Sequence, residues 1–317
     1  MSLTVVALGD SFSCGEGVGI EIKPEQTWVA LLGNAMPTAR LLNLSTAGAR
    51  TRDVRRDQLP VAIDAAPQLA TIMVGLNDVI RSGLSAGQLG EDMRAMVHAL
   101  TGTGATVLIA RWHDAGAVLG VPIRLRQALG VRLAQVNDAV ETVAADAPQR
   151  AGRPHVRILD LGRIPELIEP GAWAVDGIHP SPAGHRAIAR DAIAILADCG
   201  LPGPRLRADS DPIPMPAGPS TARRTVWLLS RGLPWLAQHS GRVAPALLST
   251  GVQAIRDPGQ LNERSATHCR NHDRSAALDV RSLVGGFGGE GAQALSYGSM
   301  SGLGQCAGTP EIAWTTG

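Results

Sequence analysis

Four side chains that together could carry out acyl transfer follow short apolar runs of the sequence. Ser11 and Asn77 each come directly after such a run, and Asp176 and His179 share a loop after the last run. A serine hydroxyl is a candidate nucleophile, and a side-chain amide can donate a hydrogen bond to a developing negative charge. A histidine near a carboxylate is an acid/base pair. If the runs are parallel strands of one sheet, their carboxyl ends bring these groups to one edge.

The apolar runs have the length and β-branched content of buried strands, and helix-like stretches lie between them. The runs are Leu3 to Leu8, Leu41 to Leu44, Leu69 to Val74, Ala105 to Ala110 and His155 to Leu161, and the helical stretches are Gln26 to Met36, Gln88 to Leu100 and Val121 to Ala147. This alternation predicts an α/β protein with a parallel sheet covered by helices on both faces. A last helix is expected to begin at Ser181-Pro182, a good N-cap followed by proline, and to run to about residue 198.

Four blocks of the sequence, in this order, resemble those of the SGNH hydrolases, also called the GDSL esterase and lipase family. They are Gly-Asp-Ser-Phe around Ser11, Ala-Gly-Ala-Arg around Gly48, Gly-Leu-Asn-Asp around Asn77 and Asp-Gly-Ile-His-Pro around His179. Phe12 stands where the family name has leucine, which exchanges one apolar residue for another. The resemblance covers roughly residues 3–198, a usual size for one α/β domain. It implies a three-layer α/β/α sandwich with a five-stranded parallel sheet, the flavodoxin-like SGNH hydrolase fold.

The resemblance also implies a serine hydrolase that needs neither a cofactor nor a metal. His179 would take the proton of Ser11 as the serine oxygen attacks an acyl carbon, and would later return it. Asp176 would accept a hydrogen bond from the other ring nitrogen and fix the tautomer, which completes a triad. The oxyanion hole is assigned by the resemblance to the backbone N–H groups of Ser11 and Gly48 and to the side-chain amide of Asn77.

Several other residues near these blocks have plainer interpretations. Asp10 is expected to hold the nucleophile loop through hydrogen bonds to nearby backbone. Cys14 is interpreted as a packing residue, and His185 as a packing or hydrogen-bonding residue of the last helix. The pair His113-Asp114, after the fourth strand, is interpreted as part of a solvated loop.

Composition excludes several other classes of protein. Lys+Arg 29 against Asp+Glu 28 gives a net charge of +1, and aromatic residues are only 3%, so nucleic acid is not an expected partner. Hydrophobic residues at 44% and charged residues at 18% are typical of a globular protein. The four cysteines lack CxxC spacing, which argues against a disulfide framework or a zinc site. No signal peptide or membrane-spanning run is recognised, so we expect a cytoplasmic protein.

The chain is expected to divide into four parts. The sequence gives no prediction of its oligomeric state. Residues 1–200 would form the hydrolase domain, 201–220 a proline-rich linker, 221–256 a basic amphipathic helical segment, and 257–317 a glycine-rich, weakly ordered tail. The stretch 222–256 has five arginines, two tryptophans and no acidic residue. Its apolar face would dock on the hydrolase domain or on a second copy, or it would contact an anionic membrane surface. Docking is preferred because helices gain most of their stability from packing.

The expected function is hydrolysis of small-molecule carboxylic esters with small or aliphatic acyl groups, through an acyl-enzyme intermediate. The same triad would support acyl-thioester hydrolysis or deacetylation of a carbohydrate. A different class is a non-catalytic binding protein that uses the basic C-terminal helix, and the four intact blocks argue against it. The loops Gly15 to Pro24 and Trp112 to Val121 are expected to shape the acyl pocket.

Overall fold

The structure is a computed structural model of the 317-residue chain. It describes residues 3–235 apart from 18–19, 37–38, 82, 115–122, 148, 151–152, 198, 200 and 202–212, together with residues 237 and 238. All of these belong to one compact unit, Met1–Cys269. The predicted tail 257–317, most of the linker and the basic segment beyond residue 238 lie outside the described residues.

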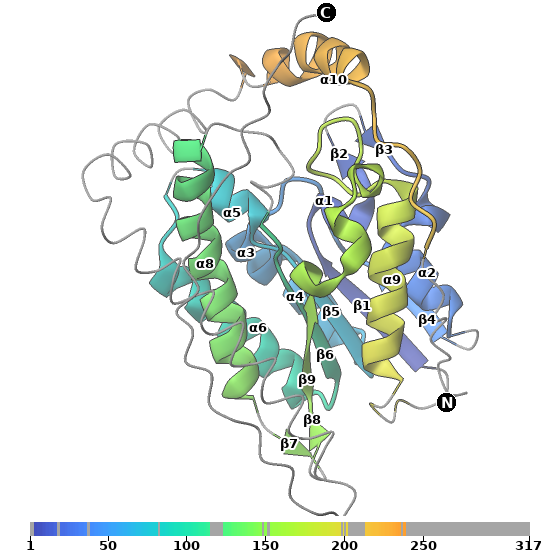
Figure 1. The fold of residues 1–317 in the computed structure, drawn as a ribbon. Coiled ribbons are helices and arrows are strands. Elements are labelled where there is room, and N and C mark those ends of the chain that lie inside the picture. Colours follow the sequence, from blue (N-terminus) through green and yellow to red (C-terminus); the bar gives the residue numbers. More distant parts are fainter. Residues whose placement is uncertain are drawn as a thin grey trace, which may run out of the picture. The chain divides into compact units, whose positions relative to one another are not determined.

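Five parallel strands form the central sheet (Figure 1). Their order is β4 (Ala39–Asn43), β1 (Leu3–Gly9), β5 (Leu69–Met73), β6 (Thr106–Arg111) and β9 (Val156–Asp160). The chain runs from β1 outward to β4 and then returns to the other side of β1, which is the flavodoxin-like order. The strand order therefore reverses between β1 and β5, where ligands of open α/β sheets bind beyond the carboxyl ends of the strands.

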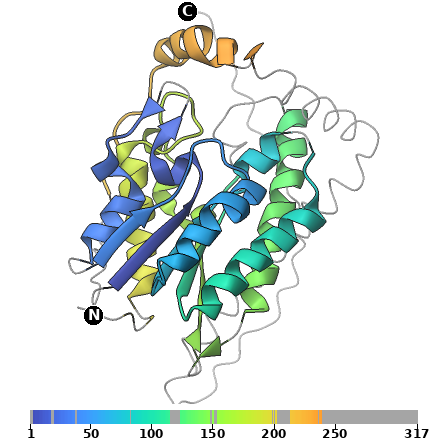
Figure 2. The ribbon, with the colours of Figure 1, turned by 180° about the vertical axis from the view of Figure 1, so that it is seen from behind.

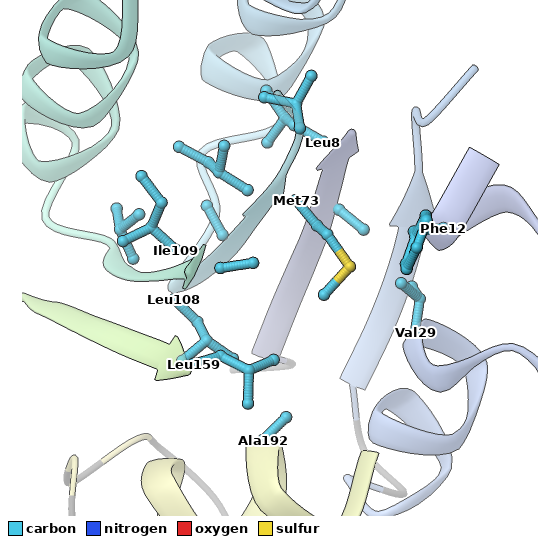
Figure 3. Close-up of a cluster of buried hydrophobic side chains, with 14 of the residues drawn as sticks. Leu8, Phe12, Val29, Met73, Leu108, Ile109, Leu159 and Ala192 are labelled. Carbon is cyan, nitrogen blue, oxygen red and sulfur yellow. The ribbon is translucent and has the colours of Figure 1, made fainter. Parts of the chain in front are cut away.

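The middle strands carry the core of the molecule. All residues of β5 are buried, as are nearly all of β1 and β6, whereas the edge strands β4 and β9 are partly exposed. Leu8, Met73, Ile109 and Leu159 come from four neighbouring strands and are at most 1% exposed (Figure 3). Strands buried on both faces explain why the sequence shows continuous apolar runs and not an alternating pattern.

Helices cover both faces of the sheet (Figures 1 and 2). Helices α2 (Trp28–Asn34) and α9 (Pro182–Leu196) pack together on one face, and α4 (Leu59–Asp64), α6 (Ala86–Gly102) and α8 (Ile123–Ala145) cover the other. The predicted three-layer α/β/α sandwich with a five-stranded parallel sheet is thus confirmed. Helix α9 begins as expected, because the Ser181 hydroxyl accepts the Gly184 N–H at 3.2 Å and Pro182 occupies the first turn. It ends at Leu196, slightly before the expected end.

The remaining elements are short. They are α1 (Ser11–Cys14), the hairpin of β2 (Glu16–Gly17) and β3 (Ile20–Glu21), α3 (Thr51–Asp53), a π-helical turn (Val54–Gln58), α5 (Leu76–Ile80), the hairpin of β7 (Gln149–Arg150) and β8 (Arg153–Pro154), and 3-10 turns at Pro24–Gln26, Leu161–Arg163, Pro165–Ile168 and Pro170–Ala172. Sequence periodicity does not reveal them, because each is shorter than the window in which a repeat is visible.

The basic C-terminal segment is helical where it is described. Helix α10 (Thr221–Trp227) continues through a π-helical turn (Leu228–Gly232), and residues 233–235 are again α-helical. Figure 1 shows α10 beyond the carboxyl ends of the strands, above β2 and β3. Within the described part of the chain, none of the helices combines the length and apolar character needed to cross a bilayer.

Candidate active site

Ser11 is the first residue of α1, directly beyond the end of β1. Asp10 caps this helix, because its Oδ1 accepts the N–H of Phe12 at 3.0 Å. Gln58 holds the end of the strand through two hydrogen bonds to Gly9. The Gln58 Oε1 accepts the Gly9 N–H at 2.8 Å, and the Gln58 Nε2 donates to the Gly9 carbonyl at 2.9 Å. Gly9 is packed closely as well, since a Cβ there would lie 2.4 Å from the carbonyl oxygen of Met73. The serine hydroxyl therefore projects from a fixed piece of backbone.

The structure brings Ser11, His179 and Asp176 into one series of hydrogen bonds. His179 Nε2 lies 2.8 Å from Ser11 Oγ, and His179 Nδ1 lies 2.5 Å from Asp176 Oδ2. The other oxygen of Asp176 accepts the N–H groups of Ile178 and His179 at 2.9 and 3.1 Å. The Asp176 side chain is 3% exposed and held at both oxygens, so it fixes the orientation of the imidazole. Such a series can move a proton from the hydroxyl to the ring.

The loop that carries Asp176 and His179 is tied to the start of α9. Trp173 and Pro180 form an isolated antiparallel bridge, and the Ala174 N–H donates to the His179 carbonyl at 2.8 Å. The capping residue Ser181 donates its N–H to the Ala172 carbonyl at 2.8 Å. The turn is thereby closed at its base, which explains why an acid and a histidine three residues apart point toward the same serine.

The two predicted oxyanion donors beyond Ser11 come from two loops that are bonded together. Asn77 stands in α5, after β5, and Gly48 in the loop after β4, with a φ of +77°. Asp78 Oδ2 accepts both the N–H and the hydroxyl of Thr51 at 3.0 Å, which links these loops. The Asn77 amide donates one N–H to Asp10 Oδ2 at 3.2 Å. A side-chain amide carries two N–H bonds, and the hydrogen bond to Asp10 uses one of them.

Asp10 therefore does more than the backbone role that the sequence suggests, because it also orients Asn77. It is completely buried, and this burial raises its pKa to about 7, against the lowering effects of the Phe12 N–H, of His179 and of Asn77. The folded protein thus holds a proton on this carboxyl up to about pH 7, whereas the unfolded chain releases it near its ordinary value of 3.8.

This difference predicts how Asp10→Asn changes stability with pH. Between the two pKa values the folded wild type binds more protons than the unfolded chain, so its free energy of unfolding falls as pH rises. The difference in unfolding free energy, wild type minus Asp10→Asn, should fall by about 2 to 3 kcal/mol between pH 5 and pH 7. Denaturant titrations of both proteins across this range measure it. A difference that stays constant with pH would show that Asp10 is not a buried, protonated acid.

The imidazole also rests on an aromatic support. The Phe12 ring lies 5.8 Å from the His179 ring and contacts Trp112 edge-on at 4.8 Å. Trp112 is 2% exposed, and Asn137 of α8 exchanges hydrogen bonds of 2.9 Å with its backbone N–H and C=O. Sequence reasoning misses both Asn137 and Gln58. For Asn137, the available signal is a polar residue within the predicted helical stretch 121–147, at a position that the helical period places inside. Gln58 lies outside the predicted helical stretches, so it offers no such signal.

Gly17 of β2 lies directly against the catalytic candidate His179. A Cβ at residue 17 would lie 2.7 Å from His179 Cε1 and 2.8 Å from Nδ1. Gly17→Ala should therefore displace the ring from Ser11 and lower kcat for an ester substrate by about 100-fold, the typical cost of a misplacement of about 1 Å. Steady-state kinetics with p-nitrophenyl butyrate measures this change.

Gly87→Ala is the matched control for this substitution. Gly87 lies in α6, and an added Cβ there meets nothing within 4 Å. Its kcat should equal that of the wild type. Equal activity of Gly17→Ala and Gly87→Ala would contradict the close contact between residue 17 and the imidazole.

These groups open into one cavity of about 640 Å³. Its lining residues come from the strand ends, from β2 and from the C-terminal segment, and they are Asp10, Ser11, Phe12, Glu16, Gly17, Ala47, Gly48, Leu76, Asn77, Ile80, Arg81, Asp176, Ile178, His179, Trp227, Leu228, Gly232, Leu233 and Trp235. Within the described part of the loop Gly15 to Pro24, Glu16 and Gly17 line it, and residues 18–19 lie outside the described residues. Residues 115–121 of the second predicted loop lie outside the described residues.

Other residues singled out in the sequence lie away from this cavity. His113 is 8% exposed and its ring stacks on the Trp173 ring at 4.6 Å, so the interpretation of His113 as part of a solvated loop is wrong. Burial lowers the pKa of His113 to about 4. His185 is buried and accepts the Trp28 N–H at 3.2 Å, as expected for a hydrogen-bonding residue. The Cys14 thiol is half-buried, and burial raises its pKa, which disfavours the nucleophilic thiolate.

Among the described residues, no group of three or more His, Cys, Asp or Glu could hold a metal ion.

A parallel α/β sandwich with a serine, a histidine and a carboxylate hydrogen-bonded in series at its carboxyl edge defines a class of hydrolases. Comparison with known families identifies the group within this class. The GDSL-like Lipase/Acylhydrolase family matches residues 7–187, more than half of the chain, and the chain belongs to this family. It is therefore a hydrolase that acts on esters.

Solved structures of similar proteins include several esterases. TesA is 22% identical with a TM-score of 0.48, and the match covers 61% of this chain and 97% of TesA. The psychrotrophic esterase EstA from Pseudoalteromonas sp. is 16% identical with a TM-score of 0.48, covering 61% and 96%. The acetylxylan esterase Axe2 from Geobacillus stearothermophilus is 18% identical with a TM-score of 0.47, covering 65% and 97%. A search of curated proteins gives no match.

Proposed function

We propose that the protein hydrolyses carboxylic esters of aliphatic acids through an acyl-enzyme intermediate on Ser11. The observation that carries this proposal is the series of bonds from Ser11 Oγ to His179 Nε2 at 2.8 Å and from His179 Nδ1 to Asp176 Oδ2 at 2.5 Å. A serine hydroxyl is a weak nucleophile at neutral pH, and a bonded imidazole is the group that activates it.

In the acylation step, Ser11 Oγ attacks the carbonyl carbon of the ester while its proton passes to His179 Nε2. The imidazolium that forms is stabilised by Asp176, which already accepts the Nδ1 proton. The carbonyl oxygen becomes an oxyanion next to the Ser11 and Gly48 N–H groups and the side-chain amide of Asn77. Collapse of this intermediate breaks the bond to the alcohol oxygen, which takes the proton from His179 and leaves as the alcohol.

In the deacylation step, water replaces the alcohol. His179 takes a proton from the water as its oxygen attacks the acyl carbon, and a second oxyanion forms at the same donors. Breaking the bond to Ser11 Oγ then releases the carboxylic acid, and His179 returns the proton to the serine. No group beyond these side chains and backbone amides takes part, and the chain regains its starting state.

The aliphatic part of the proposal follows from the cavity wall. Leu76, Ile80 and Ile178 line the cavity beside the serine, together with the apolar residues of the C-terminal segment. An apolar wall favours hydrocarbon over sugar hydroxyls, which would lose hydrogen bonds to water there without replacement. The observations therefore favour aliphatic esters over a carbohydrate ester as substrate.

Release of p-nitrophenol from p-nitrophenyl acetate and butyrate by the purified full-length protein tests the proposal. The expected result is multiple turnovers per chain, at a rate proportional to protein concentration. Release no faster than in buffer, by a protein shown to be folded by circular dichroism, would contradict it and favour a non-catalytic binding protein.

A further inference from the structure

One wall of the cavity over Ser11 comes from outside the part of the chain that matches the hydrolase family. The family match ends at residue 187, whereas Trp227, Leu228, Leu233 and Trp235 line the cavity. These residues occupy the end of α10 and the helical stretch after it. Figure 1 shows α10 on the side of the sheet where the strands end. This wall is therefore a feature of this chain beyond the shared hydrolase fold.

The added wall is apolar and only partly covered by protein. Leu228 is 47% exposed and Leu233 is 45% exposed, although both line the cavity. Large apolar side chains that face a cavity beside a nucleophile form a surface that a hydrocarbon ligand would cover. The same cavity is also lined by the polar residues Ser11, Asn77 and His179. The cavity thus combines groups suited to the ester bond with an apolar wall suited to an aliphatic chain.

The size of the cavity agrees with such a ligand. A volume of about 640 Å³ falls within the range of about 300–1000 Å³ that is usual for sites that enclose small organic ligands. An ester with short groups on both sides, such as ethyl acetate, would leave the added wall uncovered. An aliphatic chain of several carbons, extending from the ester bond, would reach it.

We propose that Trp227, Leu228, Leu233 and Trp235 form the binding site for the aliphatic chain of the ester, so that these residues set the chain-length preference of the enzyme. This inference rests on the proposed function of Ser11. Each buried methylene group improves binding by about threefold to fourfold. The wild type should therefore have a kcat/KM at least tenfold higher for an octanoyl than for an acetyl ester. The aliphatic chain of the substrate can belong to the acyl group or to the alcohol group of the ester. Substrates that carry a long chain on one side only distinguish these two cases.

The double variant Leu228→Asn/Leu233→Asn tests the inference. Both leucines are about half exposed, so their replacement should leave the fold intact. The ratio of kcat/KM for p-nitrophenyl octanoate to kcat/KM for p-nitrophenyl acetate should fall about tenfold relative to the wild type. A parallel comparison of octyl acetate with ethyl acetate shows whether the chain binds on the alcohol side instead.

Leu229→Asn is the matched control, because Leu229 belongs to the same turn, is 62% exposed and does not line the cavity. Its chain-length preference should equal that of the wild type. If the double variant keeps the wild-type ratio of octanoate to acetate, and of octyl to ethyl ester, the inference is wrong although the enzyme is an esterase. A loss of preference in Leu229→Asn equal to that of the double variant would also overturn it.

A binding measurement separates this inference from the proposed function. Titration with octanoic acid, followed by tryptophan fluorescence, requires no turnover. The wild type should saturate at a concentration several-fold lower than the double variant. Identical curves would overturn the inference, whereas different curves from a protein that hydrolyses no ester would contradict only the proposed function of Ser11.

Discussion

Ser11→Ala should lower kcat for p-nitrophenyl butyrate by about 10⁴- to 10⁶-fold, the range seen when the nucleophile of a serine hydrolase is removed. The alanine lacks the oxygen that attacks the acyl carbon, and no other described hydroxyl is bonded to His179. The backbone N–H of residue 11 stays in place, so the oxyanion donors and the cavity survive. KM should therefore change by much less than kcat. Steady-state kinetics with a high enzyme concentration measures both.

Ser13→Ala controls for effects of the substitution on α1 itself. Ser13 lies two residues further along the same helix, is completely buried, and its hydroxyl has no hydrogen-bond partner in the described structure. Its replacement removes the same atom from a neighbouring position, and kcat should stay within about threefold of the wild type. If Ser11→Ala were as active as Ser13→Ala, another residue would have to be the nucleophile.

Asp176→Asn should lower kcat by about 10⁴-fold at neutral pH, because it reverses the polarity of one hydrogen bond. The Asn oxygen can still accept the N–H groups of Ile178 and His179, so the turn keeps its shape. Its NH₂ group then faces His179 Nδ1 and donates to it. The ring is thereby held in the tautomer with its proton on Nε2, which cannot accept the proton of Ser11.

Asp191→Asn is the control for the loss of a carboxylate. Asp191 lies on α9, and its carboxylate pairs with Arg190 at 2.7 Å, away from the cavity. Its replacement should leave kcat unchanged, since a partly exposed ion pair of this kind contributes only about 0 to 1 kcal/mol to stability. The melting temperatures of both variants show whether either effect is structural. A kcat for Asp176→Asn within tenfold of the wild type would contradict the assigned role of this carboxylate.

The sequence predicts the sheet well, and the candidate residues Ser11, Asp176 and His179 that it singles out lie close together in the structure. The runs of the three middle strands are apolar on both faces, and a parallel sheet covered by helices is the arrangement that buries both faces. Ser11 and Asn77 could be placed at one edge because each lies within a few residues of the end of a strand. For His179, the signal was the Asp-Gly-Ile-His-Pro block and the N-cap at Ser181 that ends its loop.

The contacts that hold these residues in place could not be predicted in the same way. Two examples are hydrogen bonds between positions far apart in the sequence. One joins Asn77 to Asp10, and the other joins Gln58 to Gly9. Their existence depends on how helices pack on the sheet, which no local pattern encodes. The interpretation of His113 as a solvated residue was wrong for the same reason, because Trp173 covers it from a distant loop.

Local sequence patterns also could not predict which residues line the cavity. The loop Gly15 to Pro24 was expected to shape the pocket, and among its described residues Glu16 and Gly17 line the cavity. The sequence marks 221–256 as basic and amphipathic, with docking and membrane contact both open. It does not show that Trp227 and Leu228 would line the same cavity as Ser11, since this requires the path of the chain after α9.

The most direct test of the central claim is the site at which an organophosphonate reacts. With a p-nitrophenyl alkylphosphonate, Ser11 Oγ should form a bond to phosphorus and release p-nitrophenolate, which leaves a stable analogue of the tetrahedral intermediate. We expect one adduct per chain, complete loss of esterase activity, and fragmentation spectra that locate the added mass on Ser11. An adduct on another residue, such as Cys14, or full activity after labelling of Ser11, would contradict the claim that Ser11 is the nucleophile.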